Sequence, residues 1–352
     1  MTSKDIAHQR LFHQQMVDSH FTDPSALVGW MGCIQAQDFA GAKWGIGNRI
    51  KGITDAAIEK DFNDGKILRT HILRPTWHFV TPADIGWMLQ LTAPKIKAFN
   101  KRLHAKLEIT DNDLKRSKKI ITTALTNNKQ LTRTALLVLL KKAKINTDDI
   151  RISFLIMDAE LDGLICSGPR QGKQFTYALL EERAPVIKLI DTDAAIAELS
   201  KRYFLSRGPA TLQDLAWWSG LSISDAKKGI ELNKKQLAHM VVNGQAYWLA
   251  ADTKFSSKQT PTTYLLPSYD EYAVAYKDRN DILRPEYIEE TGYGIFKPTI
   301  VIDGQIAGTW KRTEQTQKVI IETKLFNNTN KTTAAAITKA TTAYADFLGK
   351  SL

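Results

Sequence analysis

Residues 211–232, TLQDLAWWSGLSISDAKKGIEL, and residues 241–249, VVNGQAYWL, decide the fold. Thr211 with Asp214 has capping-box character, which predicts a helix start. Gly220 lies where a helix-turn-helix needs its tight turn. Asn243-Gly244 between two apolar runs is a strong signal for a type I′ hairpin. We therefore expect three helices, at 193–203, 211–219 and 222–232, followed by a hairpin.

The same order of three helices and a hairpin occurs twice earlier in the chain. In the first copy we expect helices at 5–20, from Asp23-Pro24 onward, and at 54–63, with strands at 66–68 and 76–80 on either side of Arg74-Pro75. In the second copy we expect helices at 113–127, 133–143 and 148–161, with strands at 164–166 and 175–178. The tip of the second hairpin, residues 167–173, is basic and rich in turn residues.

After Lys258 the sequence changes character and predicts strands at 298–302, 305–311 and 317–322 and a closing helix at 332–348. The predicted fold class is mainly α with small β-hairpins (α+β), built as three tandem winged-helix domains plus a C-terminal β-rich domain. We place these four domains at residues 1–90, 91–188, 189–258 and 259–352.

Composition describes an ordinary globular protein, with 43% hydrophobic and 24% charged residues in a chain of 352. No apolar run approaches the 18 or so residues of a membrane span, and the N-terminus lacks the apolar core of a signal peptide. The two cysteines, Cys33 and Cys166, lie among apolar neighbours and are expected to be reduced core residues of a cytoplasmic protein. They cannot form a zinc site built on thiolates, and the seven histidines show no metal spacing.

The net charge of +11 favours a polyanionic partner. Residues 95–144 alone contain 14 Lys or Arg against 3 Asp or Glu. A solvated helix face would explain such a run, but its concentration in one part of the chain favours contact with nucleic-acid phosphates.

The tripeptide Gln35-Ala36-Gln37 is the strongest candidate for chemistry. A glutamine is neither acid nor base, but it holds a donor and an acceptor at fixed positions, so it can orient water or stabilise a positive charge. Residues two apart on a helix point roughly 200° apart, so Gln35 and Gln37 share a pocket only if the helix ends there and the backbone extends. Gly41 makes such an end plausible. The alternative is that both residues cap the helix end or face water.

Several motifs resemble the AlkZ-like winged-helix DNA glycosylases. They are Ile34-Gln35-Ala36-Gln37, Arg69 with Arg74-Pro75-Thr76-Trp77-His78, Leu265–Tyr272 with Lys277-Asp278-Arg279, and Gly308–Arg312. The family pattern is glutamine, an aliphatic residue, then glutamine or aspartate. The resemblance covers nearly the whole chain in order and implies excision of alkylated purines from DNA and unhooking of certain interstrand crosslinks.

The expected mechanism requires neither cofactor nor metal. Alkylation at N7 or N3 makes a purine cationic, so the base leaves neutral and needs no protonating acid. The enzyme has to stabilise an oxocarbenium-like sugar and position water. We expect Gln37 to position the water and Gln35 to orient Gln37 or share the water. No lysine is identified as a Schiff-base nucleophile, so the predicted glycosylase is monofunctional and not a lyase.

Basic residues in the motifs and in the charged segment are expected to hold DNA. These residues are Arg69, Arg74, His78, Lys118, Lys119, Arg133, Arg170, Lys173, Lys311 and Arg312. Asp270 and Glu271 either organise a domain junction by binding Lys or Arg or line the DNA channel, and Arg279 belongs to the same group. The expected partner is double-stranded DNA with alkylated bases, bound by a monomer at the nucleoid, without a membrane. The alternatives are a non-enzymatic winged-helix DNA-binding regulator and a protein that protects against one genotoxic natural product.

Overall fold

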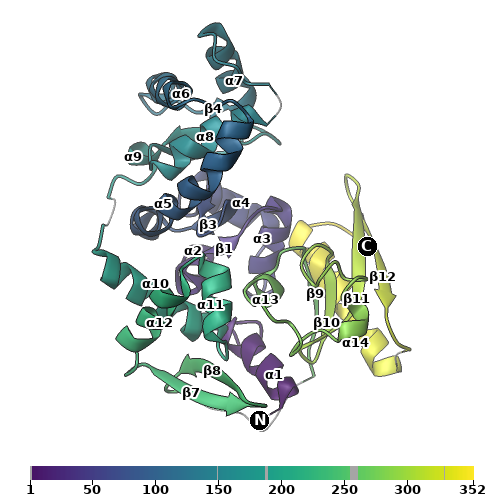
Figure 1. The fold of residues 1–352 in the computed structure, drawn as a ribbon. Coiled ribbons are helices and arrows are strands. Elements are labelled where there is room, and N and C mark those ends of the chain that lie inside the picture. The colour runs from purple at the N-terminus through teal and green to yellow at the C-terminus, as the bar shows by residue number, and fades with distance from the viewer. Residues whose placement is uncertain (1, 149, 187–188, 254–260, 329) are drawn as a thin grey trace. The chain divides into compact units, whose positions relative to one another are not determined.

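The computed structural model describes residues 2–148, 150–186, 189–253, 261–328 and 330–352. The chain divides into two compact units: unit 1 comprises residues 1–59 and 196–352, and unit 2 comprises residues 60–195. The chain passes from one unit to the other within helices α4 (Asp55–Asn63) and α10 (Thr192–Arg207). Each unit combines helices with small antiparallel sheets (Figure 1), which confirms the predicted α+β class. Among the described residues, no helix has the length and apolarity needed to cross a bilayer.

The N-terminal part of unit 1 corrects one predicted helix. The helix expected at 5–20 ends at His13, because Gln15 and Asp18 both adopt positive φ (61° and 52°). The helix expected from Asp23-Pro24 is present, and the Asp23 side chain accepts a hydrogen bond from the Ala26 N–H. The elements here are α1 (Ser3–His13), α2 (Pro24–Met31), β1 (Ile34–Gln35) and α3 (Phe39–Gly47).

The stretch that predicted the fold behaves as expected. Thr211 and Asp214 form a complete capping box at the start of α11 (Leu212–Ser219), and Gly220 ends that helix at φ 71°. Helix α12 (Ile223–Leu232) leads into the hairpin of β7 (Leu237–Val242) and β8 (Gln245–Ala250). Asn243 and Gly244 take φ of 49° and 78°, as a type I′ turn requires.

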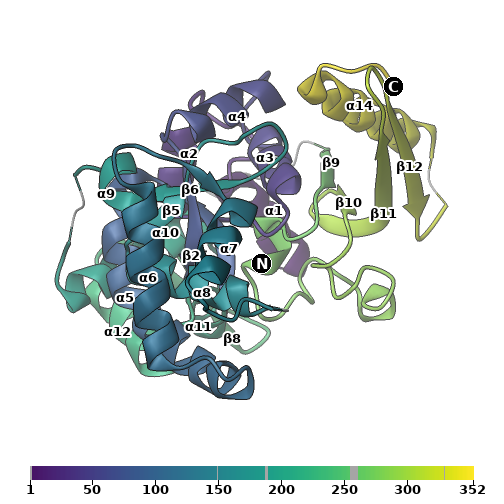
Figure 2. The same ribbon diagram turned by 90° about the horizontal axis from the view of Figure 1, so that it is seen from above.

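The C-terminal part of unit 1 is a four-stranded antiparallel sheet covered by a helix. Its order is β12-β11-β10-β9, and α14 runs alongside it (Figure 2). The predicted strands and closing helix are confirmed, and β9 is added at the sheet edge. The bounds are β9 (Thr263–Leu266), α13 (Glu271–Val274), the 3-10 helix η1 (Pro285–Tyr287), β10 (Thr299–Ile302), β11 (Gln305–Glu314), β12 (Val319–Leu325) and α14 (Lys331–Leu348).

Unit 2 contains two small antiparallel ladders and a set of helices. Strand β2 pairs with β3, and β6 lies between β4 and β5. Its core joins α6, α7 and α8 through buried aliphatic side chains such as Leu125, Leu136 and Leu155. The bounds are β2 (Leu68–Ile72), β3 (Thr76–Val80), α5 (Pro82–Lys106), α6 (Asp111–Leu125), β4 (Leu131–Thr132), α7 (Arg133–Lys142), α8 (Arg151–Leu161), β5 (Ile165–Ser167), β6 (Thr176–Leu179) and α9 (Leu180–Arg183).

Two elements of unit 2 differ from expectation. The first strand extends over Leu68–Ile72 instead of residues 66–68, and all five of its residues are buried, so no alternating pattern marks it. Helix α5 is 25 residues long with Pro94 in its interior, although a proline within a helical pattern ordinarily predicts a break.

Helix α5 also contains the expected boundary between residues 90 and 91, so the chain continues without a linker there. The boundary expected at 258 and 259 lies outside the described residues, as does residue 188. The division into three winged-helix domains and a C-terminal domain therefore remains a proposal.

A glycine allows α10 and α12 to pack closely. A Cβ atom at Gly229 would lie 1.9 Å from Ser200 Oγ and 2.7 Å from Ser200 Cβ. We expect Gly229→Ala to lower the free energy of unfolding by about 1–3 kcal/mol through overpacking, although alanine is the better helix former. Combining it with Ser200→Gly should relieve the clash, so urea titrations of the two single variants and the double variant should show strong non-additivity. Additive losses would contradict this account of the helix contact.

Candidate active site

The Gln35-Ala36-Gln37 tripeptide lies between two helices, with Gln35 in a short strand and Gln37 in a bend. Helix α2 ends at Gly32, whose φ is 76°, and β1 covers Ile34–Gln35. A new helix, α3, begins after the N-cap Asp38, whose side chain accepts a hydrogen bond from the Gly41 N–H. The expected role of Gly41 is corrected accordingly, because it lies in the first turn of the second helix and does not end the first one.

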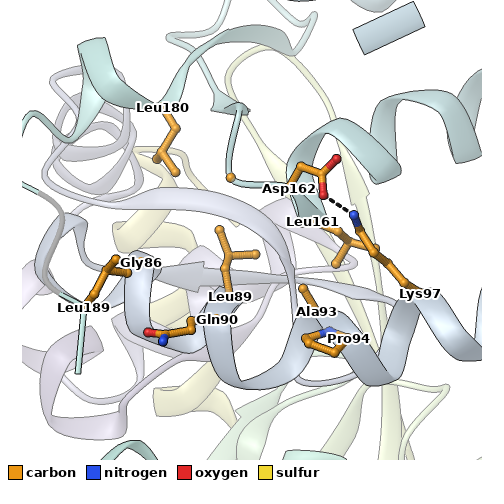
Figure 3. Close-up of a pocket in the computed structure, with 11 residues that line it drawn as sticks. Gly86, Leu89, Gln90, Ala93, Pro94, Lys97, Leu161, Asp162, Leu180 and Leu189 are labelled. Atoms are coloured by element: carbon orange, nitrogen blue, oxygen red, sulfur yellow. Dashed lines mark hydrogen bonds and ion pairs between the residues drawn. The ribbon is translucent and has the colours of Figure 1, made fainter. Parts of the chain in front are cut away.

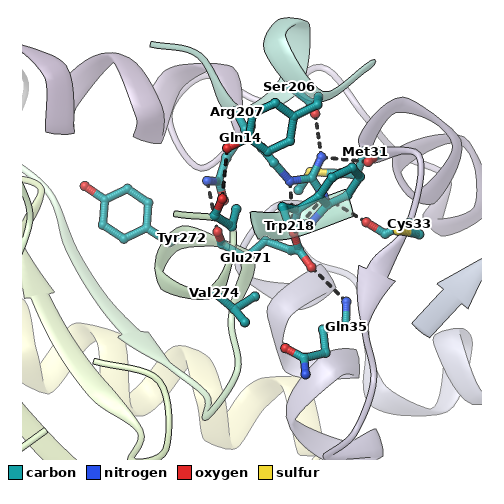
Figure 4. A network of polar contacts seen from close by, with 12 residues as sticks. Gln14, Met31, Cys33, Gln35, Ser206, Arg207, Trp218, Glu271, Tyr272 and Val274 are labelled. Atoms are coloured by element: carbon teal, nitrogen blue, oxygen red, sulfur yellow. Dashed lines mark hydrogen bonds and ion pairs between the residues drawn. The ribbon is translucent and has the colours of Figure 1, made fainter. Parts of the chain in front are cut away.

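The two glutamines have different surroundings. Gln35 is 6% exposed, and among the described residues its side-chain Oε1 has no hydrogen-bond partner. Gln37 is exposed. Figure 4 shows the Gln35 amide pointing away from the polar network that holds its backbone. A buried amide oxygen without a partner is costly, so it is a natural acceptor for a water or substrate group.

The backbone of Gln35 is held by a buried carboxylate. Its N–H donates to Glu271 Oε1 at 2.8 Å, and Glu271 Oε2 accepts from Trp218 Nε1 at 3.0 Å. Oε2 also pairs with the guanidinium of Arg207 at 2.7 Å, and both side chains of this ion pair are 0% exposed. Glu271 is thereby fully bonded and is not available as a catalytic base.

Arg207 also fixes the backbone that precedes the tripeptide. Its Nη1 donates to the Met31 carbonyl at 2.7 Å and its Nη2 donates to the Cys33 carbonyl at 2.8 Å (Figure 4). The Arg207 guanidinium lies 4.3 Å from the centre of the Trp218 ring. Burial raises the pKa of Tyr276 to about 12, and its hydroxyl donates to the Arg207 carbonyl at 2.8 Å.

A second buried ion pair lies beside the first. Asp270 accepts from both terminal nitrogens of Arg49, at 2.8 and 3.0 Å, in a bidentate arrangement. A Cβ atom at Gly41 would approach Pro267 to 3.0 Å, and one at Gly45 would approach Asp270 to 3.1 Å. These two glycines, one turn apart, let α3 lie close against the segment that contains both acidic residues.

Some predicted residues meet around the tripeptide in unit 1. Asp270 and Glu271 pair with arginines, as expected if they bind Lys or Arg rather than line a DNA channel. Arg312 on β11 lies 3.8 Å from the carboxylate of Asp38, next to Gln37, and Lys311 is exposed on the same strand. Arg279 is half-buried and donates to the Ala273 carbonyl at 2.9 Å.

Two residues of unit 2 that were predicted to contact DNA, His78 and Arg69, are buried. His78 is 0% exposed. Arg69 is 6% exposed, and its guanidinium lies 4.1 and 4.6 Å from the ring centres of Trp77 and Phe175. Burial lowers the pKa of Arg69 to about 10. The contact of these two residues with DNA stays a prediction.

The remaining predicted cations of unit 2 differ in their exposure to solvent and in their hydrogen bonds and ion pairs. Lys119 and Lys173 are exposed, and so is Arg133, which donates to Ser153 Oγ at 2.9 Å. Lys118 is tied to Asp158 at 2.8 Å and also to Asp162. Arg170 and Arg74 are half-buried on their hairpins, and Arg170 donates to the Lys173 carbonyl at 2.7 Å.

The most distinct hollow of unit 2 holds none of the predicted residues (Figure 3). It encloses about 550 Å³ and is lined mainly by leucine, alanine, proline and glycine of α5, α8 and α9. Its only charged lining residues, Lys97 and Asp162, form an ion pair with each other. Among the described lining residues, the other side chains are uncharged.

Comparison with known proteins agrees with this geometry. The family model described as DNA glycosylase AlkZ-like matches residues 28–347. An interstrand DNA cross-link repair glycosylase of Streptomyces sahachiroi is 23% identical over 317 residues, which is 84% of each chain. The solved structure of Streptomyces sahachiroi DNA glycosylase AlkZ matches 100% of this chain and 98% of its own with a TM-score of 0.81, at 20% identity.

These matches and the amide site define the class of protein as a DNA glycosylase, a hydrolase of N-glycosyl bonds. The chain belongs to the AlkZ-like DNA glycosylase family.

The residues that the sequence did not reveal are those that hold the site from behind. They are Arg49, Arg207, Trp218 and Gln14, whose Oε1 accepts from Arg49 Nη2 at 2.7 Å; all four are buried and carry no motif of their own. Arg207 lies 64 residues before its partner Glu271, and Arg49 lies 221 residues before Asp270. The acidic pair Asp270-Glu271 was the one available signal, because two adjacent carboxylates in an apolar, aromatic stretch need buried cations.

Removing the charge of Glu271 should therefore destabilise the protein. Glu271→Gln leaves Arg207 buried without a counter-charge, and we expect a loss of about 3–5 kcal/mol in the free energy of unfolding. The matched control is Glu231→Gln, which breaks a surface pair with Lys234 whose side chains are both 68% exposed. That change should cost less than about 1 kcal/mol. Equal shifts of the urea midpoint in both variants would contradict the importance of the buried pair.

Proposed function

We propose that this enzyme is a monofunctional glycosylase for purines that carry a cationic N7 or N3 alkyl adduct in double-stranded DNA. We extend the proposal to the unhooking of interstrand crosslinks made of such adducts, since a relative is named for that repair. The observation that carries the proposal is the exposed Gln37 beside a buried Gln35 whose carbonyl oxygen has no partner. The protein is proposed to act as a monomer, inside the cell at the nucleoid.

The charges around the site are arranged for a leaving group that needs no acid. Asp270 and Glu271 are engaged with buried arginines, and Asp38 caps α3 and lies 3.8 Å from Arg312, so neutral amides are proposed to meet the substrate. A cationic purine departs as a neutral base once the glycosidic bond breaks. The positive charge then moves to the sugar, where oriented amide oxygens stabilise it without reorganising.

Water supply explains why two glutamines are present. The buried Gln35 Oε1 can accept one hydrogen bond from a water molecule, and the exposed Gln37 can accept the other. A water held in this way presents its oxygen lone pair to the anomeric carbon of the sugar. Gln37 thus positions the nucleophile, and Gln35 shares that water and limits its orientation.

DNA binding is proposed to rest on exposed cations. Lys311 is exposed on β11, next to Arg312, which lies 3.8 Å from Asp38 and is 20% exposed, and Lys119, Arg133 and Lys173 are exposed in unit 2. Contacts of this kind neutralise phosphates and carry no base specificity. They suit an enzyme that must find damage in any sequence.

Gln37→Ala should lower the single-turnover rate of base release from duplex DNA containing N7-methylguanine by about 100-fold, the typical effect of losing one preorganised dipole. Gln35→Ala should give a loss in the same range. The matched control is Gln213→Ala, which removes another exposed glutamine of unit 1, on α11. Full activity in Gln37→Ala would refute the assigned role, and no release by the wild type from methylated or crosslinked DNA would refute the proposed activity.

Affinity for undamaged duplex DNA should fall linearly as the logarithm of the salt concentration rises. Lys119→Ala and Lys173→Ala should each reduce the slope by about 0.9, because each removes one phosphate contact. Lys234→Ala, which removes a lysine already paired with Glu231, should leave the slope unchanged. An affinity that is flat across salt, or equal slopes in all variants, would contradict these contacts.

A further inference from the structure

Residues Pro267 to Glu271, which are the four residues between β9 and α13 and the first residue of α13, contact the chain at Gln35 and at Gly41, on either side of Ala36-Gln37. At one end, Pro267 packs on Gly41 in the first turn of α3. At the other end, Glu271 accepts the Gln35 N–H. Tyr269 is the middle residue of this segment, two residues from Pro267 and two from Glu271, and it is half-buried.

Tyr269 adopts a backbone conformation that is costly for its residue type. Its φ is 63°, in the left-handed region that glycine or asparagine occupies at lower cost. The conformation is held in place because the Tyr269 N–H donates to the Ile295 carbonyl at 2.8 Å and Ser268 Oγ donates to the Phe296 carbonyl at 3.0 Å. A strained residue beside a reaction site indicates that its side chain has a use there.

The Tyr269 side chain supports a second, exposed aromatic ring. Tyr269 and Phe296 meet edge to face, with ring centres 5.8 Å apart and planes at 88°. Phe296 is nevertheless 59% exposed. In an edge-to-face pair at least one ring keeps a free face, and the exposure of Phe296 shows that its ring is open to solvent. The next residue, Lys297, is exposed as well.

This pair has the properties of a stacking site for a nucleobase. Every base presents an apolar π-face, so an exposed planar ring next to the reacting bond can contact the lesion or its neighbour without reading sequence. The exposed Lys297, next to Phe296, is a cation that can contact a phosphate beside such a surface. Stacking a base on the exposed Phe296 ring removes apolar surface from water, which lowers the free energy of the complex.

We propose that Phe296 stacks on a nucleobase at or directly beside the lesion and that Tyr269 is the positioning residue that holds the Phe296 ring. The proposal rests on the proposed function, because it takes Gln37 to mark the reacting bond. Phe296 thereby fixes the glycosidic bond relative to the two amides, and this contact contributes to affinity and to correct placement.

The test uses duplex DNA with 2-aminopurine next to N7-methylguanine, whose fluorescence changes when the stacking of the probe changes. We expect wild-type protein to alter the signal on binding and Phe296→Ala to bind about tenfold more weakly with the signal change lost. Phe296→Tyr should keep both properties, whereas Phe296→Leu, which is apolar but not planar, should lose the signal change. Phe12→Ala serves as the matched control, because it removes another exposed aromatic side chain of unit 1.

Tyr269→Gly separates this role from folding. Glycine relieves the positive φ, so the urea midpoint should be maintained while the fluorescence change decreases. The proposal is overturned if Phe296→Leu behaves as wild type or if Phe296→Ala keeps both affinity and signal. If the wild type releases no base but the fluorescence change still depends on Phe296, the stacking site stands and the proposed substrate falls.

Discussion

The buried ion pair between Arg207 and Glu271 is the constraint on which the site depends. Its two side chains are completely excluded from solvent, and they connect the end of α10, the turn after α2 and the start of α13. Burying two charges gains little stability by itself, because desolvation opposes the attraction between them. The pair holds the local geometry, because its other hydrogen bonds go to the backbone of Met31, Cys33 and Gln35 and to the side chains of Ser206 and Trp218.

This arrangement keeps the buried ion pairs apart from the glutamine amides that are proposed to act on the substrate. The carboxylates of Asp270 and Glu271 and the guanidinium groups of Arg49 and Arg207 neutralise one another behind the tripeptide. Neutral amides are left to face the substrate. Such a site is weak for a reaction that needs an acid, and it suits a reaction whose leaving group already carries the positive charge. Gly41 and Gly45 let α3 approach the segment that contains Asp270 and Glu271 closely.

Much of the local structure could be predicted from particular residues. Asp23-Pro24, the Thr211–Asp214 box and Asn243-Gly244 each act over a few residues, and each produced the expected helix start or turn. Errors occurred where tertiary contacts overrule local pattern. Strand β2 is buried on both sides and shows no alternation, and α5 continues through Pro94. Arg69 and His78 carry polar groups typical of surfaces but lie inside unit 2.

The sequence by itself determined the α+β class, the positions of most turns and the glutamine pair, because capping, turn geometry and amide chemistry are properties of neighbouring residues. Family resemblance added the order of motifs along the chain. Only the tertiary structure decided which arginine neutralises which carboxylate, which glutamine is buried and which is exposed, and that the rings of Tyr269 and Phe296 meet. Those facts depend on contacts between residues 27 to 236 positions apart, and hydrophobic periodicity carries no information at that separation.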